Sequence, residues 1–514
     1  MDTNPLRFLF VLLFVALAGC QTVEQRPAID LSELTVAKIH KAYQEGSYNS
    51  RELVAAYQER IDRLDTALNA ITYINPDALE RAQMLDEEYQ RTGKLRPLHG
   101  IPMIVKDNFN TRGLPTTGGS LALQNFIPAT NAFMIDRLLD AGAIILAKSN
   151  MAEWAFSPMH TFSSTFGMTH NPYDTSRVPA GSSGGSGAAV AANLGAIGLG
   201  TDTGNSIRGP SSHCCLVGFR STLGLTSRSG IIPLYLRNDV AGPMCRTVED
   251  ATRVLEVIAG YDADDPVTSH SRGQIPEGYQ QFLKKDGLQG ARIGVLRALS
   301  DDDPDPEIQA LFEKALADMD SLGATIVDTV DVPDFSDLRK NQWCSDFRED
   351  IETYLQTYVP GDTMQTLEDI IEAGTRSDYV AQRLEYFARH SGRSQNPEIA
   401  CLDPYEDVRR IAFREAIEER MDELKLDAIV YPTWNHKPAG IDSFQADYKG
   451  DNSQVIAPHT GQPAFTVPMG FSGQHLPAGL QFLGRMFDEP TLIRLTYAYE
   501  QGTLHRRPPK VGNR

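Results

Sequence analysis

The sequence lacks an excess of positively charged residues. Its 514 residues contain 48 Lys and Arg against 67 Asp and Glu, which gives a formal net charge of −19. Proteins that bind DNA or RNA neutralise phosphates with clustered Lys and Arg, and here the one basic run is the short tail of Arg506, Arg507 and Lys510. We therefore predict no binding of nucleic acid. With 41% hydrophobic and 8% aromatic residues, the composition is that of a globular protein and excludes a disordered chain, collagen or a coiled coil.

The sequence also lacks a hydrophobic run long enough to cross a bilayer. Its most apolar stretch, Phe8 to Ala18, falls short of the about 20 residues that a transmembrane helix needs but fits the ~7–15 residues of a signal-peptide core. The run ends in Leu17-Ala18-Gly19-Cys20, which resembles the bacterial lipobox, where cleavage precedes a cysteine that is then acylated. We expect residues 1–19 to be a signal peptide, Cys20 to carry a lipid anchor, and residues 20–30 to form a short leash.

This interpretation predicts an exported lipoprotein of a bacterial cell envelope, on the periplasmic side or at the outer membrane, with membrane attachment through Cys20. Two alternatives stay open: a plain secretory signal followed by an unrelated cysteine, and a short buried apolar segment. Asp2 is unusual in the region that normally carries positive charge in a signal peptide.

Cysteine is scarce and irregularly spaced. The chain has six cysteines, of which five remain if Cys20 is acylated, and it contains no Cys-x-x-Cys pair. An odd and unpatterned set does not indicate a disulfide framework. The 11 histidines form no HExxH or other zinc spacing, and there is no EF-hand loop. We predict no metal.

Apolar runs of strand length alternate with helical periods, which is typical of an α/β fold with a partly parallel sheet. Residues 292–296, 308–322 and 324–330 have the pattern of strand, helix and strand, a βαβ unit. The acidic run 301–306 is predicted as the solvated entry to that helix. From about 335 to 424 the pattern is polar and helical, which predicts a helical insertion. Other predicted elements are helices at 76–93 and 489–502 and strands at 101–105, 428–431, 464–467 and 480–482.

The most unusual segment is rich in glycine and serine. It runs from Pro179 to Gly187 and leads into a predicted small apolar helix at 188–194. A flexible linker is one interpretation, although the stretch is not repeated and lies between structured segments. A phosphate-binding loop is a second, but neither GxxxxGKS/T nor a GxGxxG after a strand occurs. The third takes Ser183 as the nucleophile of a GxSxG elbow in an α/β-hydrolase esterase, yet turn-like residues stand where that motif needs a strand.

Another set of matches explains more of the chain. The sequence resembles the amidase signature family, whose GGSSGGS, GTDTGGSIR and GIPxxVKD segments carry a Ser-Ser-Lys triad. Here residues 180–186 are AGSSGGS, residues 200–208 are GTDTGNSIR and residues 100–107 are GIPMIVKD. Weaker family matches lie at residues 218–224, 242–250, 463–468 and 479–485.

Several matches in the right order are far more specific than one, so the chain is identified as a member of this family. The resemblance implies a single large α/β domain over residues 31–510, with a mixed, twisted β-sheet core covered by helices on both faces.

The resemblance also implies the roles of three residues. Ser206 matches the nucleophile, Ser182 the bridging serine held after an unusual cis peptide bond, and Lys106 the base. A serine needs an adjacent proton acceptor in order to attack, and a lysine can serve only when its amine is neutral. Because Lys106 ends an apolar strand, we expect burial to lower its pKa. Successive strand side chains point to opposite faces, so the Asp107 carboxylate is expected to point away from it.

Backbone N–H groups of the turn formed by Thr203, Gly204, Asn205 and Ser206 are expected to bind the oxyanion. At the position of Asn205 the relatives usually carry glycine. Asparagine is the next most tolerant residue for positive φ, so the turn is expected to form, with the new side chain intruding on the leaving-group side or adding a donor.

Three further residues of these segments are expected to support the triad. Ser183 is expected to hydrogen-bond to it, and Asp202 and Arg208 are expected to pair with each other and brace the loop. Aromatic residues that could line the pocket, or equally belong to the core, are Trp343, Tyr354, Tyr431 and Trp434.

The implied reaction is hydrolysis of a carboxamide through an acyl-enzyme on Ser206, with release of ammonia or an amine and no cofactor. One branch of the family supplies ammonia during tRNA charging, a cytosolic role that an export signal disfavours. Residues 343–354 resemble the helical region of peptide amidases, so a small-molecule or peptide amide is the expected substrate, without an obligate protein partner. Fatty-acid amides, aryl acylamides and cyclic oligoamides stay open as substrates. A lipid-anchored binding protein with impaired catalysis is a second hypothesis, supported by Asn205 alone.

Overall fold

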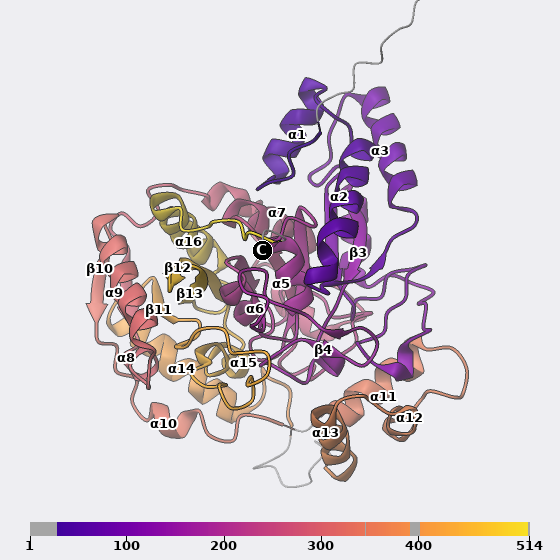
Figure 1. The fold of residues 1–514 in the computed structure, drawn as a ribbon. Helices are drawn as coiled ribbons and strands as arrows, with labels where there is room; N and C mark the ends of the chain where they lie inside the picture. The colour runs from indigo at the N-terminus through magenta and orange to yellow at the C-terminus, as the bar shows by residue number, and fades with distance from the viewer. Residues whose placement is uncertain (1–27, 345, 391–400, 512–514) are drawn as a thin grey trace, which may run out of the picture.

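The fold is described from a computed structural model, which covers residues 28–344, 346–390 and 401–511 (Figure 1). The predicted signal peptide, Cys20 and most of the predicted leash lie outside these residues. Within the covered ranges, no helix is both long and apolar enough to cross a membrane.

A mixed sheet of eleven strands forms the centre of the described chain. Its strands, in spatial order, are β1 (Ile71–Ile74), β3 (Ile144–Ser149), β2 (Pro102–Lys106), β6 (Ile197–Asp202), β8 (Val240–Cys245), β7 (Val217–Arg220), β12 (Ala464–Ser472), β13 (Leu476–Leu483), β11 (Ala428–Pro432), β9 (Arg292–Val295) and β10 (Thr325–Asp328). A separate small sheet pairs β4 (Phe162–Ser163) with β5 (Gly167–Met168).

Helices surround the sheet (Figure 1). Along the chain, the helices before and between the first three strands are α1 (Val36–Glu45), α2 (Ser50–Leu64), α3 (Ala78–Thr92) and α4 (Phe133–Asp140). The middle of the chain adds α5 (Gly184–Ala191), α6 (Arg208–His213), α7 (Val248–Ile258), α8 (Arg297–Ser300) and α9 (Pro306–Ser321). The last group is α10 (Phe335–Leu338), α11 (Phe347–Tyr358), α12 (Leu367–Ala373), α13 (Asp378–Arg389), α14 (Val408–Glu423), α15 (Ala457–Thr460) and α16 (Glu489–Thr503).

The sheet mixes parallel and antiparallel pairs. β2 is parallel to both β3 and β6, and β9 is parallel to both β10 and β11, whereas the other neighbours are antiparallel. Every residue of β2, β3 and β6 is buried, as expected for strands covered on both faces. The predicted single large α/β domain with a mixed sheet is confirmed.

The predicted βαβ unit is present as β9, α9 and β10, with the two strands parallel. Asp305, from the acidic run, caps α9 by accepting the backbone N–H of Glu307 at 2.9 Å. The short helix α8 between β9 and α9 was not expected from the sequence.

Two helix starts differ from the sequence prediction. α3 begins at Ala78, two residues after Pro76. It ends at Thr92 and is closed by Gly93, as predicted, with Gly93 in the left-handed region. α5 begins at Gly184, inside the glycine- and serine-rich stretch rather than at Ala188. Close packing explains the glycines in this helix, since a Cβ at Gly185 would lie 2.2 Å from the backbone oxygen of Asn150.

The predicted helical insertion contains α10 to α14 and, over its described residues, no strand. A hydrophobic cluster attaches α11, α12 and α13 to the rest of the domain through Trp154, Phe156 and Leu234. The rings of Phe156 and Phe347, for example, pack edge to face with centroids 4.7 Å apart. This attachment places the insertion next to the loops that carry the site.

Candidate active site

The sheet brings the two key motifs to one edge. β2 ends at Lys106 and β6 ends at Asp202, and the two strands are parallel neighbours in register from Met103 opposite Ile197. Since parallel strands end at the same edge, the turn that follows β6 begins beside the lysine. This is the edge at which α/β sheets commonly bind ligands.

Lys106 is fully buried. Its Nζ lies 2.8 Å from Ser182 Oγ and 2.8 Å from Thr201 Oγ1, and Asn108 Nδ2 donates to the same Thr201 hydroxyl at 3.1 Å. Burial lowers the pKa of Lys106 to about 7, although the nearby charges of Asp239 and Asp202 oppose the shift. Near neutral pH a substantial share of this amine is therefore unprotonated, as the sequence led us to expect.

Asp107 points away from Lys106, as strand alternation predicts. Its carboxylate forms an ion pair with the buried Lys148 at 3.6 Å and accepts hydrogen bonds from the backbone and the hydroxyl of Thr117. The carboxylate next in sequence to the lysine is thus neutralised by other partners.

Ser182 is held by the backbone on each side. The Gly181–Ser182 peptide bond is cis, as the family resemblance implied, and the Ser182 carbonyl accepts the N–H of Ala152 at 3.0 Å. A Cβ at Gly181 would lie 2.3 Å from the backbone oxygen of His160 and 2.4 Å from that of Ser157, so only glycine fits there. Ser182 is thereby positioned with its hydroxyl in hydrogen-bond contact with Lys106.

Ser183 has a different environment. It is fully buried, and its hydroxyl donates to the Thr201 carbonyl at 3.2 Å while accepting the Thr201 N–H at 3.3 Å. It therefore hydrogen-bonds to the strand that carries Thr201 and not to a triad side chain. The Ser183 hydroxyl is committed in this way to the backbone of β6, and Ser183 does not line the cavity beside Ser206, which disfavours the esterase alternative based on Ser183.

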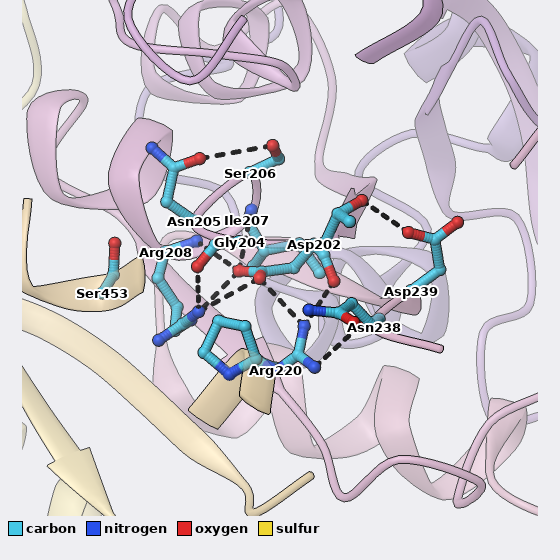
Figure 2. Close-up of polar contacts among 12 residues, drawn as sticks. Asp202, Gly204, Asn205, Ser206, Ile207, Arg208, Arg220, Asn238, Asp239 and Ser453 are labelled. Carbon is cyan, nitrogen blue, oxygen red and sulfur yellow. Dashed lines mark hydrogen bonds and ion pairs between the residues drawn. The ribbon is translucent and has the colours of Figure 1, made fainter. Parts of the chain in front are cut away.

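Ser206 lies in the turn between β6 and α6. Its hydroxyl donates a long hydrogen bond, 3.4 Å, to Oδ1 of Asn205 (Figure 2). Among the described residues no hydrogen bond joins it to Ser182. Sequence matching placed these two serines in one relay, whereas here the Asn205 side chain holds the Ser206 hydroxyl.

A buried ion cluster braces this turn (Figure 2). Arg208 contacts both carboxylate oxygens of Asp202, with Nε 3.0 Å from Oδ2, and Arg220 adds a second ion pair at 3.0 Å. Burial disfavours the charged carboxylate, but the two guanidinium groups outweigh it and hold the pKa of Asp202 at about 2. Arg208 also donates to Gln481 Oε1 at 3.1 Å, which gives a structural reason for a glutamine in the C-terminal family motif.

The bracing orients a peptide group. Arg208 donates to the Gly204 carbonyl at 2.7 Å, and in a planar trans peptide the N–H of the next residue points the opposite way. The Asn205 N–H therefore points away from the buried arginine. Within the described chain, the backbone N–H groups of Thr203, Gly204, Asn205 and Ser206 form no hydrogen bond, which leaves them available as oxyanion donors.

Asn205 departs from the sequence expectation in its backbone. Neither Gly204 nor Asn205 has positive φ, so the tolerance of asparagine for that region is not needed here. Its side chain donates to the Pro158 carbonyl at 3.3 Å and accepts the Ser206 hydroxyl. The side chain thus lies within the site, directly beside the candidate nucleophile.

The turn opens into a cavity of about 430 Å³. Part of its wall comes from the turn and from the loop at residues 155–158, and the rest from the insertion and distant loops. The lining residues are Ala155, Phe156, Pro158, Thr203, Gly204, Asn205, Ser206, Leu234, Tyr235, Trp343, Cys344, Tyr379, Arg383, Tyr386, Tyr448 and Gln454.

Of the four aromatic candidates from the sequence, only Trp343 lines this cavity. Tyr354, Tyr431 and Trp434 are buried, and each has its polar atom hydrogen-bonded inside the protein. They belong to the core.

Sequence reasoning missed several residues of the site. Thr201 lies inside a matched motif, so its position was visible although its contact with Lys106 was not. Asp239 accepts the Thr203 hydroxyl at 2.5 Å and comes from a separate loop. Tyr235 and Arg383 carry no motif, and only the packing of the insertion brings them to the cavity. Within the described ranges, no group of three or more His, Cys, Asp or Glu is placed to hold a metal ion.

The fold and this site define a serine amidase. The Amidase family model matches residues 52–493, and the chain belongs to that family. It is 34% identical to a probable amidase of Arabidopsis thaliana over 97% of this chain and 95% of that protein. It is also 34% identical to a glutamyl-tRNA(Gln) amidotransferase subunit from Microcystis aeruginosa, over 93% of this chain and 100% of that one.

Solved structures agree with this assignment. The peptide amidase from Stenotrophomonas maltophilia superposes with a TM-score of 0.82 and 36% sequence identity, covering 94% of this chain and 99% of that one. An amidase family protein from Bacillus anthracis gives a TM-score of 0.83 with 30% identity, covering 94% and 93% of the two chains. The protein is an enzyme that hydrolyses amide bonds.

Proposed function

We propose that Ser206 is the nucleophile of this amidase, that Ser182 relays its proton and that Lys106 is the base. The observation that carries the proposal is the fully buried Lys106 amine, 2.8 Å from the Ser182 hydroxyl. In the first step Ser206 Oγ bonds to the amide carbon, its proton passes to Ser182, and the Ser182 proton passes to Lys106. For this step the Ser206 hydroxyl turns from Asn205 to Ser182.

The negative charge that develops on the carbonyl oxygen is bound by the unpaired N–H groups of the turn at 203–206. Donors fixed in advance in this way typically contribute about 3–4 kcal/mol each to transition-state stabilisation. The intermediate then collapses and the C–N bond breaks. The leaving nitrogen takes a proton from Ser182, which regains one from Lys106, so ammonia or an amine departs in neutral form.

Water completes the cycle by the same route. It attacks the Ser206 ester, gives a proton through Ser182 to Lys106, and the acid product leaves as Ser206 Oγ recovers its proton. Lysine and both serines end in their starting states, and no cofactor takes part in this scheme.

For the substrate we propose an amidated peptide or a small carboxamide of similar size. The likeness to a peptide amidase supports this choice, as does an aromatic cavity of about 430 Å³, a size within the usual range for small-ligand sites. The similar glutamyl-tRNA(Gln) amidotransferase subunits are, by their name, one subunit of an enzyme that transfers an amide group. We propose that this chain acts without partner subunits of that kind, because its N-terminal segment has the features of an export signal.

The first test separates the two candidate nucleophiles. Ser206→Ala should lower kcat/KM for ammonia release from simple amides by about 10³-fold or more and should abolish covalent labelling by a fluorophosphonate probe. Ser183→Ala is the matched control and should still be labelled, because its hydroxyl is buried against β6. Labelling that persists in Ser206→Ala contradicts the proposal. If the unaltered protein neither turns over amides nor reacts with the probe, the binding-protein hypothesis is favoured.

A second test is the pH dependence of catalysis. Below pH 7 the Lys106 amine becomes protonated and cannot accept a proton, since its pKa lies at about 7. For an uncharged amide, kcat/KM should therefore rise about tenfold per pH unit below 7 and level off above it, because this parameter reports the free enzyme. A profile that is flat between pH 5.5 and 8, measured where the protein stays folded, would show that Lys106 is not the base.

A third test addresses Asn205. Removing the acceptor that holds the Ser206 hydroxyl should raise kcat/KM about 2- to 10-fold, the range for one net hydrogen bond. Because Asn205 does not have positive φ, Asn205→Ala should behave like Asn205→Gly. A loss of activity in both variants would mean that the side chain assists the reaction, and a gain in Asn205→Gly alone would show that backbone freedom limits the turn.

For location, we propose export and anchoring through a lipid on Cys20, which rests on the sequence of residues 1–20. Expressed in a bacterium, the full chain should fractionate with membranes, and Cys20→Ala should lose both lipid labelling and membrane association. Gln21→Ala is the control and should stay with the membranes. Unchanged processing and fractionation of Cys20→Ala would refute the anchor.

A further inference from the structure

Among the described residues that line the catalytic cavity, Arg383 is the single Lys, Arg, Asp or Glu. It lies on α13, within the helical insertion, so the chain reaches the cavity here from far outside the catalytic motifs. Its side chain is half-buried. A cation in a wall otherwise built of aromatic, apolar and neutral polar groups is the strongest electrostatic feature that a substrate meets there.

The contacts of Arg383 leave donors unused. Its NH2 group donates to the Tyr235 hydroxyl at 3.0 Å, and its guanidinium lies 4.9 Å from the centre of the Phe387 ring. Its Nε is buried and has no hydrogen-bond partner in the described structure. A guanidinium carries five N–H donors. Aromatic faces compensate part of the cost of removing this cation from water, but they do not satisfy its N–H groups.

Neighbouring arginines are paired in a way that Arg383 is not. Arg208 forms a bidentate ion pair with Asp202, and Arg237, whose guanidinium also contacts Cys344 of the cavity wall, pairs with Asp407 at 2.6 Å. No carboxylate of the described residues forms an ion pair with Arg383. A partly buried cation that forms no ion pair with a described carboxylate is suited to an anion brought by a ligand.

Tyr235 supplies a second donor at the same place. Its oxygen accepts from Arg383, and no described group accepts its own proton. Burial raises the pKa of Tyr235, so the hydroxyl keeps that proton at physiological pH. The Tyr235 backbone N–H donates to Asp239 at 3.2 Å, and Asp239 also accepts the Thr203 hydroxyl. These bonds hold the paired donors in a fixed relation to the oxyanion turn.

We propose that Arg383 and Tyr235 together bind a carboxylate of the substrate, so that the enzyme prefers carboxamides whose acyl part carries a second, anionic group. The inference deepens the proposed function, because it takes Ser206 as the nucleophile in the same cavity. The anion belongs to the acyl part since hydrolysis of a primary amide leaves only ammonia on the other side. Two sources share this chemistry: an acidic side chain on an amidated peptide, and the half-amide of a dicarboxylic acid.

Binding tests the proposal without turnover. In full-length Ser206→Ala, calorimetry compares N-acetylglutamic acid α-amide with N-acetylnorvaline amide, whose side chain has the same carbon backbone without the carboxylate. We expect the anionic amide to bind at least tenfold more tightly. The difference should disappear when Arg383→Gln is added and should return in part with Arg383→Lys. Arg389→Gln, an exposed arginine on the same helix that pairs with Glu385, is the matched control and should keep the difference.

Turnover then identifies the source. With Ser206 present, we expect the ratio of kcat/KM for the anionic over the neutral amide to be about 10 to 100 and to fall to about 1 in Arg383→Gln. The same ratio for glutaric acid monoamide over pentanamide tests whether half-amides of dicarboxylic acids are substrates. A preference found for only one of these two substrate pairs identifies the source of the carboxylate and supports the proposal.

The failures are distinguishable. Equal binding of anionic and neutral amides, or a preference that survives Arg383→Gln, overturns the carboxylate site even if Ser206 proves essential. An Arg383→Gln variant that loses both substrates equally also overturns it, because that is the result of a purely structural role. Conversely, a charge preference in binding with no turnover by the unaltered enzyme supports the carboxylate site and refutes the proposed function.

Discussion

The burial of one amine is the constraint on which the proposed chemistry of this protein depends. In the proposed mechanism Lys106 can accept a proton because burial lowers its pKa, and a carboxylate close to the amine would oppose that shift. Three carboxylates lie near in sequence or space, and each has other partners. Asp107 pairs with Lys148 on the neighbouring strand β3, Asp202 is held between two arginines, and Asp239 accepts a hydroxyl and two backbone N–H groups. The site therefore depends as much on where its negative charges are directed as on where the lysine sits.

The ion cluster at Asp202 has a second role. Breaking a buried ion pair typically costs about 3–5 kcal/mol, so the loop that leaves β6 is strongly confined. Through Arg208 the same cluster fixes the Gly204 carbonyl and hence the direction of the neighbouring N–H. The pKa of Lys106 and the orientation of the proposed oxyanion donors are thus linked through one carboxylate, Asp202, which ends β6 and braces the turn that follows it.

Much of the fold and of the candidate site could be predicted from sequence, and the features that could not be predicted have physical causes. Lys106 and Asp107 follow strand alternation, and Asp305 follows helix-capping chemistry, because these effects act over a few residues. The start of α5 could not be predicted because glycine has a low intrinsic helix propensity. In the folded chain a glycine is nevertheless required at position 185, since a Cβ there would collide with the backbone of Asn150. The conformation of Asn205 was misjudged because residue type was used to infer φ. Tyr235 and Arg383 could not be found at all, since the hydrophobic cluster around Phe156 and Phe347 brings them to the cavity from distant parts of the chain.

The groups proposed for catalysis and much of the cavity wall opposite them belong to different parts of the fold. The groups proposed to carry the reaction stand on β2, β6 and the turn after β6, which are buried and rigidly paired. Much of the opposing wall, including Trp343 and Arg383, stands on or beside helices joined to the domain through side-chain packing. Neither Trp343 nor Arg383 forms a hydrogen bond or ion pair with Asp202 or Lys106 in the described structure. The net charge of −19 means that the field at the protein surface repels anions at long range. Inside the cavity, however, the attraction between the Arg383 guanidinium and a bound anion acts at contact distance and is only weakly screened by salt. The proposed carboxylate site is therefore compatible with an acidic protein.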